Sequence, residues 1–295
     1  TRSLSKELKK KAKQFESIVK TGRTHLQDAV PMMLGDEFSG YAALIDHSVD
    51  QLNSAQKDLC AIPLGGTAIG TGLNAHPQFA TKVITRLKKV TKLPIKKSSN
   101  RFAAQSCPLV FMQLSSALSE TSTALHKIAN DIRFLASSQY EELQLPELQP
   151  GSSIMPGKVN PVLCESVIQV TQYCMGADAT VRLAVMSNSH FELNTSLPVI
   201  SQSLLVPINL LANVTSAFMK KTVMKIKANK KVIQENTQRN PILATALAPH
   251  IGYDKAAKIA KEAVRSGKPI IEIAQKYTKI SEGELRKIFD PKRLT

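Results

Sequence analysis

Residues 151–161 contain the densest set of side chains in this chain that could do chemistry. They read GSSIMPGKVNP, so two hydroxyls, a lysine and an asparagine lie close together with no acidic residue among them. Such a loop can present a hydroxyl, a cation and an amide donor to one small anion. Its end also predicts a helix start, because Asn160 is a good N-cap and Pro161 suits the first helical position. A flexible connection before a capped helix is the alternative interpretation.

Residues 21–31, TGRTHLQDAVP, form a second polar segment between two predicted helices. Its polar side chains include Thr24, His25, Gln27 and Asp28. A histidine beside a hydroxyl can bind a carboxylate or move a proton near neutral pH. An ordinary surface turn explains the same composition, so both interpretations stay open.

Two further segments are polar or glycine-rich. Residues 63–74 read PLGGTAIGTGLN, and residues 190–194 read HFELN at a break between two long helical patterns. The glycines lack the strand–GxGxxG–helix setting of a nucleotide site, and no P-loop lysine follows them. A structural loop, or a loop whose backbone approaches a small ligand, is the better interpretation.

The elements that must position these segments are predicted to be helices. A heptad pattern indicates a helix about 40 Å long, at roughly 1.5 Å per residue. The positions with this spacing are Cys107, Phe111, Leu114, Leu118, Thr121, Leu125, Ile128, Ile132 and Leu135. Such a helix needs long partners, for which residues 162–186 and 197–224 are suitable. Earlier helices are expected from Leu4 to about Gly22 and over residues 38–52.

We therefore predict an all-α protein, a bundle of long helices with a small helical C-terminal domain. The bundle is assigned to residues 1–224 and the small domain to residues 225–295, where the helical patterns shorten. Loops are expected at 22–35, 63–77, 94–100 and 145–160. No stretch alternates convincingly as a β-strand.

The net charge of +16 is the unusual bulk property. Basic residues lie mostly on the polar sides of helical patterns, aromatic residues make up 5% of the chain, and tryptophan is absent. Without a base-stacking platform or a reader module, nucleic acid is not an expected partner. No uninterrupted apolar run is long enough to span a bilayer, so no membrane is expected either.

The cysteines and the start of the chain bear on the compartment. Cys60, Cys107, Cys164 and Cys174 show no CxxC pairing and are predicted to be buried, reduced thiols of a cytoplasmic protein. The first residues do not resemble a signal peptide. The chain begins with Thr1 instead of methionine, which indicates a processed or truncated product.

Taken together, these segments resemble the fumarase/aspartase superfamily. Residues 151–160 match its GSSxxPxKxN signature in full, and residues 22–31 are similar to its other shared loop. The resemblance continues through residues 65–74 to residues 245–253, TALAPHIGY, in the order of the family. It covers essentially the whole chain.

The resemblance implies a homotetramer with sites shared between subunits, and anti-elimination from a succinate-type dicarboxylate without metal or redox cofactor. It makes Ser152 the base, although the assignment over Ser153 rests on the family's first serine. Lys158 and Asn160 then hold the carboxylate on which negative charge grows. It also implies that Thr24 and His25 bind the other end of the substrate, with Glu165 pairing with the histidine.

Within the superfamily, residues 190–194 and 249–260 are similar to class II fumarases. The expected reaction is therefore reversible hydration of fumarate to (S)-malate. Residues 24–27 and 160–162 are somewhat aspartase-like, so aspartate ammonia-lyase is the alternative. A non-catalytic relative that uses the bundle as a scaffold is a third hypothesis.

One departure from the family is large. The resemblance implies a further domain and the first part of the helical core ahead of Thr1, including residues that bind the substrate carboxylates. We therefore expect a piece of a cleaved or split protein, or a truncated one, whose partner is a separate N-terminal fragment. By itself the chain is expected to be inactive.

Overall fold

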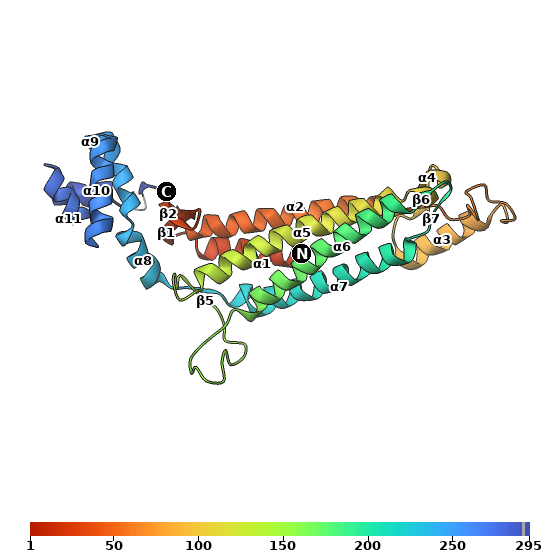
Figure 1. Ribbon diagram of the computed structural model, residues 1–295, viewed down its shortest axis with the longest axis horizontal. Helices are drawn as coiled ribbons and strands as arrows, with labels where there is room; N and C mark the ends of the chain where they lie inside the picture. Colours follow the sequence, from red (N-terminus) through yellow and green to blue (C-terminus); the bar gives the residue numbers. More distant parts are fainter. Residues whose placement is uncertain (291–292) are drawn as a thin grey trace. The chain divides into compact units, whose positions relative to one another are not determined.

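The structure is a computed structural model that describes residues 1–290 and 293–295. It is mostly helical, as predicted from the sequence (Figure 1). The chain divides into two compact units that interleave along the sequence. The first unit comprises residues 1–5, 43–130 and 162–220, and the second comprises residues 6–42, 131–161 and 221–295.

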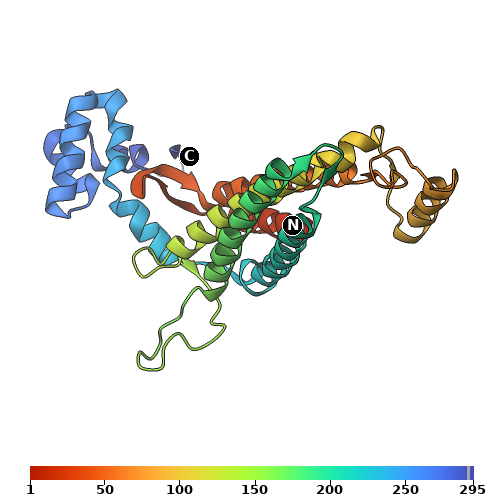
Figure 2. The same ribbon diagram turned by 45° about the vertical axis from the view of Figure 1, so that its right-hand side comes forward.

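Long helices dominate the first unit and run side by side (Figures 1 and 2). They are α5 (Leu109–Leu135), α6 (Val162–Ser187), α7 (Leu197–Lys221) and most of α2 (Leu34–Leu59). The predicted heptad pattern is confirmed in α5 from Leu118 through Leu125 to Leu135, which are buried, whereas Phe111 and Leu114 are partly buried. Hydroxyls on that face bond within the helix, as where Thr121 Oγ1 donates to the Ala117 carbonyl at 2.8 Å.

Short elements join the long helices of the first unit. They are β3 (Ala61–Ile62), α3 (Phe79–Thr91), β4 (Lys96–Lys97), α4 (Arg101–Ser106), β6 (Ser189–His190) and β7 (Leu193–Asn194). Strands β3 and β4 pair in parallel, and β6 and β7 pair as an antiparallel hairpin.

The second unit contains α1 (Arg2–Gln14) from Lys6 onward and the C-terminal helices. The latter are α8 (Lys230–Arg239), α9 (Ala248–Ile251), α10 (Tyr253–Ser266), α11 (Ile270–Tyr277) and α12 (Glu282–Ile288), with 3₁₀ turns at Val223–Lys225 and Pro241–Leu247. An apolar core lies among the elements from Leu243 onward and includes Leu247, Ile259, Ile273 and Leu285, each fully buried.

The prediction that no β-strand occurs is wrong for residues 19–33. They form an antiparallel hairpin of β1 (Val19–Thr24) and β2 (Gln27–Met33). Residues 20–22 are buried in succession, so burial does not alternate and a search for a two-residue period misses the strand. The helix predicted to reach Gly22 ends at Gln14 instead, because the β-branched pair Ile18–Val19 favours extended backbone.

Two other predictions need correction. Cys60, Cys164 and Cys174 are buried, but Cys107 is exposed and lies outside α5, because the following Pro108 disfavours helical backbone at this position. A segment long and apolar enough to span a bilayer by length and composition does occur at Leu197–Lys225, where an 18-residue window has a mean hydropathy of 1.5 and is 28% buried. A core helix of a soluble protein meets the same criterion.

Candidate active site

The segment that carries Ser152 is an irregular loop in the second unit. It follows β5 (Leu143–Gln144), which pairs with β8 (Lys227–Ala228). The loop is closed at its neck by Asn160, whose Nδ2 donates to the Gly151 carbonyl at 2.9 Å. A Cβ at Gly151 would lie 2.0 Å from the Lys158 carbonyl oxygen. The two ends of the signature therefore meet at a distance that only glycine permits.

Inside the loop, the Ser152 hydroxyl oxygen faces two backbone donors. The amides of Ile154 and Met155 donate to Ser152 Oγ at 3.2 and 3.1 Å. Two N–H groups directed at one oxygen stabilise negative charge there, as in an oxyanion hole. The same bonds also describe an ordinary serine turn. Ser153 is exposed.

The remaining residues of the signature lie around this neck. Lys158 is exposed, and Asn160 is partly buried where its amide closes the loop. Helix α6 begins at Val162, one residue later than the predicted start at Pro161. Glu165 lies in the first turn of α6, where the helix dipole favours an acid.

Thr24 and His25 lie at the tip of the hairpin and are exposed. His25 and Leu26 form its turn, with φ values of 55° and 59°. Positive φ at both central positions suits the right-handed twist of a hairpin but is strained for residues other than glycine. Such strain persists only where the surrounding structure holds it.

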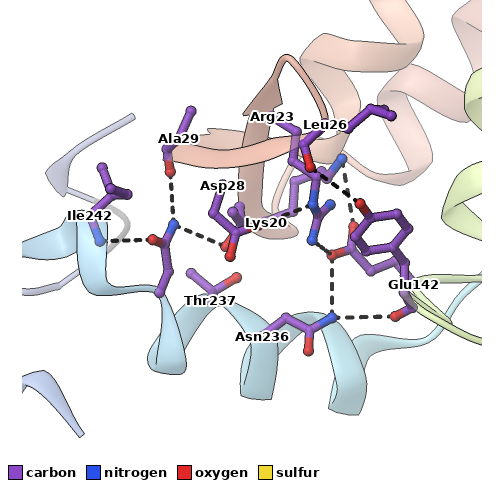
Figure 3. A network of polar contacts seen from close by, with 12 residues as sticks. Lys20, Arg23, Leu26, Asp28, Ala29, Glu142, Asn236, Thr237 and Ile242 are labelled. Atoms are coloured by element: carbon purple, nitrogen blue, oxygen red, sulfur yellow. Dashed lines mark hydrogen bonds and ion pairs between the residues drawn. The ribbon is translucent and has the colours of Figure 1, made fainter. Parts of the chain in front are cut away.

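The surrounding structure is a network of polar contacts below the turn (Figure 3). Arg23 Nη2 donates to Glu142 Oε1 at 2.6 Å, Arg23 Nε donates to Asp28 Oδ1 at 3.2 Å, and the guanidinium lies 4.3 Å from the centroid of the Tyr140 ring. Burial is the largest single influence and acts to lower the pKa of Arg23, but the interactions with Glu142, Asp28 and Tyr140 together outweigh it, so the pKa is raised. Tyr140 Oη donates to the Leu26 carbonyl at 3.4 Å.

A second anchor of the hairpin is Asn240. Its Nδ2 donates to the Ala29 carbonyl at 2.7 Å and to Thr21 Oγ1 at 3.3 Å, and its Oδ1 accepts from the Ile242 amide at 2.9 Å. Asn240, Glu142 and Lys20 lie outside the candidate motifs of the sequence. Each is a common surface residue type, and nothing in its local pattern indicates burial.

Four of the predicted site residues fall into two separate groups. Ser152 and Asn160 belong to the loop, while Thr24 and His25 belong to the hairpin. Across the described residues, none of the hydrogen bonds or ion pairs joins the side chains of the two groups. Residues 1–290 and 293–295 also contain no cluster of three or more His, Cys, Asp or Glu side chains placed to hold a metal ion.

The mostly helical fold and the closed GSS loop agree with the resemblance found in the sequence. In agreement, residues 1–176 match the protein family described as "Lyase", and residues 243–295 match "Fumarase C C-terminus". The chain belongs to the fumarase/aspartase superfamily of lyases.

The relatives give a more specific comparison. The chain is 44% identical to a class II fumarate hydratase of Bradyrhizobium diazoefficiens, covering 99% of this chain and 62% of the relative. It is 44% identical to the mitochondrial fumarate hydratase of Rattus norvegicus, covering 90% and 53%. The crystal structure of a class II fumarase from Schistosoma mansoni superposes with a TM-score of 0.93 at 36% identity, over 98% of this chain and 64% of that one. The chain thus spans about three fifths of its relatives' length.

Proposed function

We propose that this chain supplies the proton-abstracting loop and the histidine hairpin of a class II fumarate hydratase. The reaction is the reversible hydration of fumarate to (S)-malate. The observation that carries the proposal is the pair of amides directed at Ser152 Oγ, 3.2 and 3.1 Å away. A serine hydroxyl is a weak base, and these donors stabilise the alkoxide that must accept the proton.

In the direction of dehydration, Ser152 removes a proton from the carbon next to one carboxylate of malate. The electron pair left behind is delocalised into that carboxylate, forming an aci-carboxylate with extra negative charge. Lys158 and Asn160 hold this group, with Ser153 beside them, and their stabilisation increases toward the transition state. The double bond then forms as the hydroxyl on the other carbon is protonated and leaves as water.

The other end of the substrate is assigned to Thr24 and His25, with Glu165 as the acid that pairs with the histidine. The exposed tip of the hairpin supports this assignment, because Thr24 and His25 are free to face a ligand or a neighbouring subunit. Neither the proton transfer nor the elimination in this scheme uses a metal or a redox cofactor.

We also propose that the site is shared between the subunits of a homotetramer, in the cytoplasm. Large apolar side chains remain exposed on two bundle helices, such as Leu183 and Met186 on α6 and Leu205 on α7, with exposed fractions of 57%, 70% and 56%. Apolar side chains grouped on a surface support a protein–protein contact there. The predicted division into residues 1–224 and 225–295 stays a proposal, supported by the separate apolar core of the C-terminal helices.

The test uses a preparation of the complete protein and follows the absorbance of the fumarate double bond. Malate should support turnover and aspartate should not; the reverse result would make the protein an aspartase. Ser152→Ala should reduce kcat by several orders of magnitude, since it removes the base. Ser153→Ala is the matched control and should retain far more activity. Near-normal turnover by Ser152→Ala would overturn the base assignment.

A further inference from the structure

Glu142 is a carboxylate with no exposed surface, and the catalytic scheme above gives it no role. It lies between the β1–β2 hairpin and α8, as Figure 3 shows. Its Oε1 accepts from Arg23 Nη2 at 2.6 Å and from Asn236 Nδ2 at 3.4 Å, and its Oε2 lies 3.6 Å from Lys20 Nζ. A buried charge of this kind is retained only where it is paired.

Two cations and two further carboxylates surround Glu142. Lys20 has an exposed fraction of 1% and bonds both carboxylate oxygens of Glu37 at 3.0 Å. Arg23 bonds Glu142 and, at the rim, Asp28. Without Glu142, the guanidinium of Arg23 would stay largely buried with only the half-exposed Asp28 to pair with. The hairpin would then have to move to bring that cation to water.

Toward the hairpin, Glu142 acts through the residue that precedes Thr24 and His25. Arg23 is paired with Asp28 in the strand register, and its side chain is held from below by Glu142. This arrangement fixes the base of the strained turn on both strands.

Toward the loop, the backbone of Glu142 fixes the start of the segment that leads to Ser152. Its amide donates to the Leu135 carbonyl at 2.8 Å, and its carbonyl accepts from the Asn229 amide at 2.9 Å. The next residues pair with β8, where Leu143 is opposite Ala228. The side chain of Glu142 therefore contacts the hairpin that carries Thr24 and His25, while its backbone is bonded at the start of the segment that leads to Ser152.

We propose that Glu142 is a positioning residue that holds the Thr24–His25 hairpin, through Arg23, in register with the root of the Ser152 loop. Its effect on turnover rests on the proposed function, but its effect on structure does not.

The structural arm uses amide hydrogen exchange on this chain of 295 residues. Glu142→Gln removes the charge at nearly constant shape, and the neighbouring exposed Glu141→Gln is the matched control. Amides in residues 23–28 and 143–144 should exchange at least about tenfold faster in Glu142→Gln than in the control. Those of α6 and α10 should not change. Unchanged exchange in the hairpin, or faster exchange throughout the chain, would overturn the positioning role.

The kinetic arm uses the complete protein. Glu142→Gln should lower kcat by about 100-fold with a smaller change in KM, since a displacement of about 1 Å costs that much in rate. The double variant Arg23→Gln/Glu142→Gln also removes the unpaired cation, so its kcat should be no lower than that of Glu142→Gln alone. Multiplying losses would show that Glu142 does not act through Arg23.

The two arms separate the two hypotheses. If the parent protein does not turn over fumarate or malate, the proposed function fails. The exchange result then still decides the positioning role of Glu142 by itself.

Discussion

The closure of the Ser152 loop leads to a prediction about Gly151. A Cβ at this position would lie 2.0 Å from Lys158 O, whereas real Cβ atoms essentially never approach closer than 3.0 Å. Gly151→Ala must therefore separate the two ends of the loop by about 1 Å, moving Ser152 away from Lys158 and Asn160. A displacement of about 1 Å costs about 100-fold in rate, which corresponds to about 2.7 kcal/mol.

Steady-state kinetics of fumarate hydration by the complete protein should show this loss in kcat/KM. The midpoint of urea unfolding should stay within error of the parent, because the loop is largely exposed and contributes little to the core. Both measurements are needed, since a general loss of stability would also reduce activity.

Two glycine controls isolate the steric effect. A Cβ at Gly157 would have nothing within 4 Å, but the φ of this residue is +78°. Gly157→Ala should therefore cost about 1 kcal/mol of backbone strain, which would lower kcat/KM by at most about fivefold. Gly176 lies on α6, also in open space, and Gly176→Ala should leave turnover unchanged. Activity of Gly151→Ala within threefold of the parent would refute the close contact between the ends of the loop.

Two further predictions concern stability. Phe218 is fully buried on α7, so Phe218→Ala should lower the free energy of unfolding by about 3–5 kcal/mol. The side chain of Phe191 is 93% exposed, so Phe191→Ala should change this free energy by less than about 0.5 kcal/mol. Equal midpoints of urea unfolding for the two variants would contradict the prediction. Burial, with Glu37 and Asp131 nearby, raises the pKa of Tyr41 well above its usual value of 10.0. The folded state therefore keeps this proton when the unfolded state loses it, so the stabilisation is complete below pH 10 and falls above it by up to about 1.4 kcal/mol per pH unit. Tyr41→Phe should remove that slope between pH 10 and 11 in urea unfolding, and an identical slope in both proteins would show that Tyr41 is not its source.

The sequence predicts those parts of the molecule whose geometry is local. The heptad spacing predicts the buried face of α5 because a helix repeats its own contacts every turn. The signature predicts the loop because the contacts that shape the loop also lie within a short stretch of the chain. Asn160 bonds Gly151, and the amides of Ile154 and Met155 bond Ser152, all within residues 151–160.

The geometry of the hairpin cannot be predicted from the local sequence, because the residues that support the hairpin are distant along the chain. Arg23 meets Glu142 across 119 positions, and Asn240 meets Ala29 across 211. An isolated two-stranded hairpin is marginal in water, so residues 19–33 depend on these contacts for their shape. In the sequence, Glu142 is merely the second of two adjacent acids.

This difference bears on how a relative of this chain should be judged. A protein can keep every residue of the signature and still lose the hairpin geometry through a change at Glu142 or Tyr140, neither of which lies in a candidate motif. The reverse also holds, because a change at Gly151 acts on the loop while the network under Arg23 stays intact. Whether such a chain can catalyse the proposed reaction therefore depends on the contacts under the hairpin as well as on those within the loop, and the signature reports only the latter.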